Sequence, residues 1–147
     1  MAAGDVKKEF GMKVQKYTLK TTTGVTKGYV LAYDTDGYAH ASTSLKGPFV
    51  VALETIPAPA SGQATCKVLE EGVVEVPKVT GAIVQGQWVA ISSTPGKVKA
   101  YAAMDAPATY TEAGMQAELD KQEQIVGRCE TAAASADATV LIRLLPA

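Results

Sequence analysis

The second half of the chain is a series of short β-prone runs, and each run is ended by turn residues. These runs are rich in valine and isoleucine, and they occupy residues 72–78, 86–91, 125–129 and 139–145. Runs of this length that are bounded by glycine or proline are typical of β-strands. We therefore predict a mainly β fold built from short antiparallel strands.

The first half of the chain continues the same pattern. Residues 17–21 alternate between larger and polar side chains, which is the period of a half-buried strand. Asp36-Gly37 and Pro95-Gly96 predict hairpin turns, and Glu70-Glu71-Gly72 predicts a further turn between two strands. The predicted strands are residues 17–21, 29–33, 38–42, 49–53, 64–69, 73–76, 88–91, 97–101, 125–129 and 138–145. Roughly nine or ten short strands at this spacing predict a small β-sandwich or a rolled β-barrel.

One segment departs from the β pattern. Thr109 and Glu112 have the spacing of a capping box, and the residues that follow favour helix. Met115 and Leu119 are four residues apart and so share one helical face. We therefore predict one short helix over residues 109–124.

The length of 147 residues fits a single domain. Residues 1–13 show neither helical nor clean strand periodicity, so we predict an N-terminal arm there. Residues 14–147 are then one β-rich domain.

The charge of the chain argues against one functional class. The net charge of −1 argues against a nucleic-acid binder, which needs to neutralise several phosphates. Lysines do gather near the N-terminus, but Asp5 and Glu9 interrupt them, so they predict a solvated or partner-facing segment. Charged residues make up 20% of the chain, below the usual share of about 25%, which suits a surface partly covered by partner subunits.

Targeting signals are missing from the sequence. It has no apolar stretch of the roughly 18 residues that a membrane helix needs, and its first 15 residues do not form a signal peptide. We therefore expect no membrane association and synthesis in a cytoplasm.

Reactive residues are scattered. His40 is the only histidine and has Ala39 and Ala41 as its neighbours, so we expect a structural role for it. Cys66 and Cys129 lie far apart, without the spacing of a zinc or redox motif, and are expected to be buried reduced thiols. We predict no catalytic residue, metal site, cofactor or small-molecule substrate, and hence no enzyme.

Two alternatives remain open from the residues themselves. Glu70, Glu71 and Glu75 cluster in sequence, and paired carboxylates facing each other across a cleft would favour a hydrolase. Trp88 with the tyrosines on a concave platform would favour a module that binds carbohydrate or a host surface, although Trp88 is equally suited to packing in a core or an interface.

The ordered set of motifs resembles the capsid cement, or decoration, proteins of tailed bacteriophages. The resemblance covers about residues 14–145, apart from the helical segment. The matching pieces are Tyr17-Thr-Leu19, Gly28-Tyr-Val30, Gly72-Val-Val-Glu-Val-Pro-Lys78, Gly86-Gln-Trp-Val89, Ile125-Val-Gly127 and Val140-Leu-Ile-Arg-Leu144.

This resemblance implies a β-rich homotrimer that sits on the outer surface of an icosahedral capsid in the virion. There it would clamp neighbouring major capsid proteins against the pressure of packaged DNA. On that reading, candidate capsid or subunit contacts are Lys7, Lys8, Phe10 and Met12 of the arm, together with Trp88. An exposed Phe and Met next to lysines are favourable only if a partner covers them.

Overall fold

The fold is mainly β, as predicted. The computed structural model describes residues 3–4, 6–102, 106 and 110–144, and for residues 6–11 it describes the backbone alone. The strands in this range are β1 (Val6–Thr18), β2 (Val30–Asp34), β3 (Gly37–His40), β4 (Val50–Ala52), β5 (Thr65–Pro77), β6 (Trp88–Ile91), β7 (Val98–Ala100), β8 (Ile125–Thr131) and β9 (Thr139–Leu144). The helix in this range is α1 (Glu112–Glu123).

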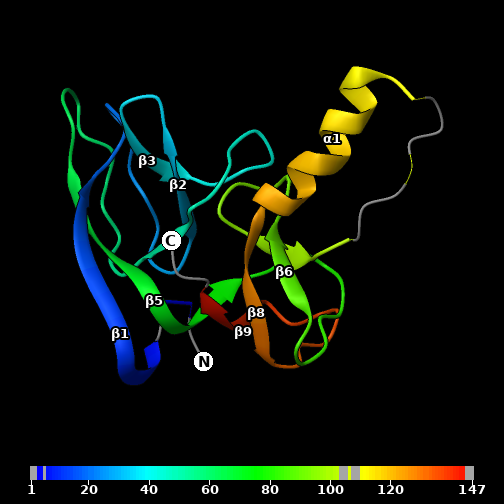
Figure 1. Cartoon of the computed structure of the whole chain (residues 1–147). Helices are drawn as coiled ribbons and strands as arrows, with labels where there is room; N and C mark the ends of the chain where they lie inside the picture. The colour runs from blue at the N-terminus through cyan, green and yellow to red at the C-terminus, as the bar shows by residue number, and fades with distance from the viewer. Residues whose placement is uncertain (1–2, 5, 103–105, 107–109, 145–147) are drawn as a thin grey trace.

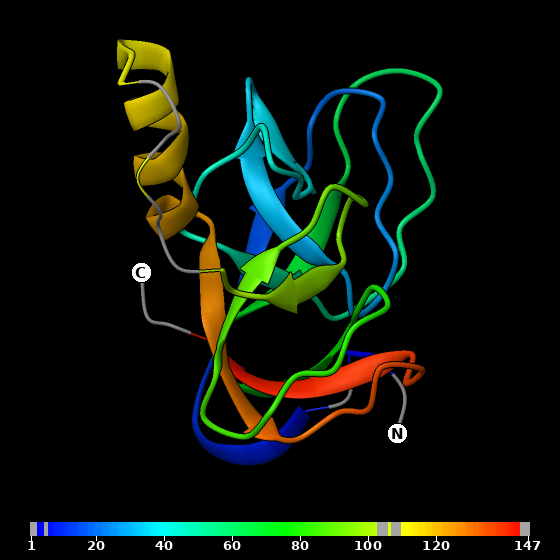
Figure 2. The same cartoon turned by 90° about the vertical axis from the view of Figure 1, so that its right-hand side faces the viewer.

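The strands form one curled antiparallel sheet in the order β3-β2-β4-β5-β9-β8-β6-β7. The long strand β1 pairs with β5, and Figure 1 shows the two strands side by side. The loop between β6 and β7 brings the far end of this order back to its beginning. The Gly96 amide donates to the Ala41 carbonyl at 2.7 Å, and the Gly96 carbonyl accepts from the Val30 amide at 3.0 Å. These bonds roll the sheet into a half-barrel, which Figure 2 shows from the side.

The middle strands are buried on both faces. Val51 packs in the main hydrophobic cluster inside the roll, whereas Val50 and Ala52 pack in a second cluster on the other face. The second cluster is closed by the segments around Val25 and Ile56, whose backbones pair with each other. This double burial explains why β2 and β4 read as continuous apolar runs and not as alternating ones.

The predicted turn at residues 70–72 is wrong. Residues 65–77 form the single strand β5, and Gly72 lies inside it at φ +138°. Glu70 is 9% exposed, and its carboxylate forms an ion pair with Lys13 at 3.1 Å. Pairing with β1 and β9 therefore outweighs the local turn preference of Glu-Glu-Gly.

Within the segment predicted as an N-terminal arm, residues 6–13 form a strand that the sequence periodicity did not indicate. These residues are the first part of β1, and Val6 stands opposite Val74 of β5. Because the two strands pair through the backbone, clear side-chain periodicity was not needed to form the ladder.

The predicted helix exists, but its cap differs. Thr111, and not Thr109, is the N-cap: its hydroxyl accepts from the Gly114 amide at 3.0 Å. Thr109 lies outside the described residues. The helix projects from the body (Figures 1 and 2), and its contacts with the body are at its C-terminal end, where Lys46 bonds Asp120 at 3.0 Å and Glu123 at 2.7 Å.

Candidate interaction surface

The start of β1 contains a large irregularity. Lys8 stands opposite Val73 and Lys13 stands opposite Glu71, so four residues of β1, 9–12, face Gly72 alone. A bulge of this kind bends the strand and leaves part of its backbone unpaired. Two of the predicted contact residues, Phe10 and Met12, lie in this bulge. The Met12 side chain is 39% exposed. For Lys7, Lys8 and Phe10 the structure describes the backbone alone.

Trp88 begins β6 and remains 38% exposed. The Arg128 guanidinium of β8 lies over its ring at 4.6 Å from the centroid, and Arg128 Nε donates to the Gly86 carbonyl at 3.3 Å. The stacked cation holds the indole in place on the outside of the sheet. Trp88 is thus a fixed, partly exposed aromatic residue of the kind that often anchors protein interfaces.

Strand register connects Trp88 with the bulge of β1. Trp88 is opposite Arg128, Arg128 is opposite Arg143, Arg143 is opposite Val73, and Val73 is opposite Lys8. Four interstrand steps of about 4.8 Å make this row about 19 Å long, measured along the curled sheet. Among the predicted contact residues, the backbone positions of Lys8 on β1 and Trp88 on β6 are therefore the two ends of one row across five strands.

The sequence-based prediction of contact residues did not include Arg128 and Arg143, the two arginines in this row. Arg143 is held by Glu130, with Nε donating to Oε1 at 2.7 Å. The available signal was a single arginine within each apolar strand, Ile125-Val-Gly-Arg128 and Val140-Leu-Ile-Arg143. A lone charge in such a run marks the solvent side of the strand.

His40 has the structural role expected of it. Its Nε2 accepts a hydrogen bond from the Thr26 amide at 3.1 Å, and its ring lies 4.8 Å from that of Tyr29. Burial lowers the pKa of His40 below its ordinary value. The imidazole is therefore held neutral as an acceptor for a loop amide.

Both thiols are free and buried, as predicted. Cys66 belongs to the second cluster and Cys129 to the main one, so they lie on opposite faces of the sheet. Burial raises the pKa of each thiol, which disfavours the reactive thiolate.

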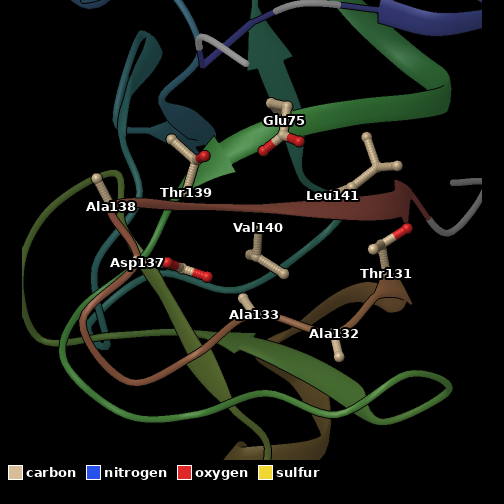
Figure 3. Close-up of a pocket in the computed structure, with 9 residues that line it drawn as sticks. All are labelled: Glu75, Thr131, Ala132, Ala133, Asp137, Ala138, Thr139, Val140 and Leu141. Atoms are coloured by element: carbon tan, nitrogen blue, oxygen red, sulfur yellow. The ribbon is translucent and has the colours of Figure 1, made fainter.

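The carboxylates do not form the pair that a hydrolase would need. Glu70 and Glu71 are neighbours in one strand and so point to opposite faces. Glu70 is bound by Lys13, whose pKa is raised by that hydrogen bond and by the Glu70 charge. Glu75 lies four residues beyond Glu71 and faces β9 (Figure 3).

Three of the tyrosines form one cluster, and Trp88 is not part of it. Tyr17 and Tyr38 stack at 4.9 Å, and Tyr33 meets Tyr38 edge-on at 5.7 Å, beside β2 and β3. Trp88 lies toward the other end of the strand order, on β6. Among the described residues, no ring contact joins Trp88 to a tyrosine, and the group stacked on its indole is Arg128.

Within the described ranges, no group of three His, Cys, Asp or Glu side chains is placed to hold a metal ion. In the same part of the chain, no helix is long and apolar enough to cross a membrane.

The chain is thus a curled β domain with a fixed, partly exposed tryptophan on one strand and an irregular edge strand. The family model described as phage cement protein matches residues 10–144. The chain therefore belongs to the phage cement protein family, as its motifs had suggested. No curated protein and no solved structure matched the chain.

Family membership defines the role in outline. A cement protein is a structural component that associates with the capsid of a phage and stabilises it. Its partners are capsid proteins.

Proposed function

We propose that this protein binds the exterior of an icosahedral capsid as a homotrimer and clamps neighbouring major capsid proteins together against the pressure of packaged DNA. The observation that carries the proposal is the family match over residues 10–144. In this role the protein needs neither a substrate nor a cofactor.

The β1 edge supports contact with another chain. Among the described strands, β5 is the one that pairs with β1, so the other edge of β1 keeps backbone donors and acceptors for a partner. Such an edge attracts a further strand unless something blocks it. Residues 6–13, with Lys7, Lys8, Phe10 and Met12, are the proposed capsid contact.

Trp88 supports a second contact on the same row. Its indole is already fixed by Arg128, so burying it against a partner requires little further ordering. Because many copies bind one shell, and each trimer binds through three equivalent contacts, modest contacts of this kind add up to firm attachment.

Co-sedimentation with undecorated shells tests the two contacts. Trp88→Ala should weaken binding, whereas Tyr33→Ala should not, although Tyr33 is also an exposed aromatic residue at 58%. Phe10→Ser should weaken binding as well. Equal binding of all three variants and the parent protein would exclude both β1 and Trp88 as capsid contacts.

A further inference from the structure

An acidic pocket opens on the outer face of β5 and β9. It has a volume of about 380 Å³, and its polar lining comes from Glu75, Asp137, Thr131 and Thr139. Figure 3 shows the Glu75 carboxylate pointing from β5 across β9, between Thr139 and Leu141. No lysine or arginine is among the described residues that line the pocket.

Glu75 is the unusual member of this pocket. The residue is 5% exposed, and its Oε2 has no hydrogen-bond partner among the described residues. Asp137 adds a second carboxylate, which accepts from the Ala134 amide at 2.8 Å. The neighbouring Lys78 ammonium is bound instead to the carbonyl oxygens of Ser135 and Asp137. A buried carboxylate without a partner is costly, so the pocket favours a cation.

The opposite imbalance occurs elsewhere on the same chain. Lys16 of β1 and Lys67 of β5 stand directly opposite each other, and both are exposed. The described residues provide no carboxylate within ion-pair distance of either ammonium. Like charges in directly opposite positions repel each other, so this pair favours an anion from outside the chain.

These two sites cannot neutralise each other within one chain. Lys67 and Glu75 are eight residues apart on the same strand, or about 26 Å along an extended backbone, well beyond the reach of a lysine side chain. In a ring of identical chains, however, each interface joins two different surfaces of the molecule. One chain can then supply the cation and the next chain the pocket.

We propose that the Glu75 pocket of one copy receives a lysine ammonium from the Lys16–Lys67 pair of the neighbouring copy. The occupant is thus a second copy of this chain, and the same contact recurs between each pair of neighbouring subunits in the ring. The inference depends on the proposed trimer and adds the residues that join its subunits.

The test is a double-mutant cycle on the purified full-length protein. Sedimentation velocity over a concentration series gives the subunit dissociation constant for four proteins: the parent, Glu75→Gln, a variant in which both Lys16 and Lys67 are changed to Gln, and a variant that combines all three changes. Loss of the pocket carboxylate and loss of the lysine pair should each weaken association by about tenfold or more, as truncating one member of a buried charge pair does. The combined variant should be little weaker than either of these two variants.

Two control variants and a check of protomer stability show whether a loss of association comes from the proposed contact. Glu71→Gln on the same strand and Lys99→Gln on β7 remove the same charges outside the proposed contact and should leave association unchanged. The Glu75→Gln protomer, checked by circular dichroism and thermal unfolding, should be as stable as the parent or more stable, since an unpaired buried charge is removed.

Two results would overturn the inference while the parent is a trimer. One is association that is unchanged or tightened by Glu75→Gln. The other is a variant that trimerises normally but loses binding to shells, because the capsid protein would then be the occupant. A parent protein that is monomeric at all concentrations would contradict the proposed trimer itself.

Discussion

The guanidinium of Arg128 lies 4.6 Å above the centre of the Trp88 ring, and the two residues are directly opposite each other on β6 and β8. This contact combines a cation–π interaction with shielding of an exposed indole. It also keeps the tryptophan in one orientation on the surface that we propose meets the capsid.

Loss of this contact should be measurable. Arg128→Ala should lower the free energy of unfolding by about 0.5–1 kcal/mol, the size of an exposed cation–π interaction. Arg128→Lys should cost less, because it keeps the charge without the planar group. Urea denaturation followed by tryptophan fluorescence measures both, and an unaltered midpoint in Arg128→Ala would show that the stacking contributes nothing.

Gly127 should tolerate no side chain. A Cβ at this position would overlap the backbone carbonyl of Arg143 on β9, which cannot move without breaking the ladder. Gly127→Ala should therefore lower the free energy of unfolding by more than about 2 kcal/mol.

Gly62→Ala is the matched control for this glycine. Gly62 has open space around its Cβ position but a φ of +76°, so alanine there should cost only about 1 kcal/mol, from backbone strain. If the two variants were equally stable, close packing at Gly127 would not be the reason for the glycine.

His40 should make stability depend on pH. Burial lowers its pKa in the folded state below the unfolded value of about 6.5, so the unfolded chain binds more protons in mildly acidic solution. This contribution is complete above the unfolded pKa, is lost as pH falls from there toward the lowered folded pKa, and is constant below it.

His40→Gln should remove that part of the pH dependence. Thermal unfolding between pH 7.5 and 5 measures it in both proteins. The variant should also bind shells as the parent does, since the imidazole bonds a loop amide and has no role in the proposed contact. Parallel pH curves for the parent and the variant would show that His40 is not the group that titrates.

Cys66 and Cys129 should be protected from thiol reagents in the folded protein. Both are buried and burial raises both pKa values, so labelling should follow unfolding of the chain. Mass spectrometry after incubation with iodoacetamide, with and without denaturant, provides the measurement. Rapid modification of either thiol in native buffer would contradict the assigned burial.

Local signals were sufficient for much of this fold. The turn signal in Asp34-Thr-Asp-Gly37 predicted the β2–β3 hairpin, although its loop residues are Thr35 and Asp36 and the positive φ is at Thr35 and not at Gly37. The apolar runs identified the strands around it. The sequence-based prediction was wrong where pairing with neighbouring strands, and not the local sequence, determines whether a segment is extended. Glu70-Glu71-Gly72 has the composition of a turn, yet partners on both sides keep it extended within β5.

The strand at residues 6–13 also depends on its pairing partner and could not be predicted from its own sequence. Their side chains give no period, but the exposed backbone of β5 provides a ladder for them. The candidate surface was predicted in part. Trp88 stood out by residue type, whereas its row with Arg128 and Arg143 depends on strand register, which a single sequence does not reveal. The buried carboxylate of Glu75 was likewise hidden, because the sequence does not show which carboxylates lack a partner.

The most direct test of the central claim is the heat stability of undecorated, DNA-filled shells before and after addition of the purified protein. DNA release can be followed with an intercalating dye. We predict saturable binding as trimers and a rise in the temperature of DNA release, with a smaller rise for Trp88→Ala than for Tyr33→Ala. Saturable binding with no change in the release temperature, or no binding at all, would contradict a cementing function.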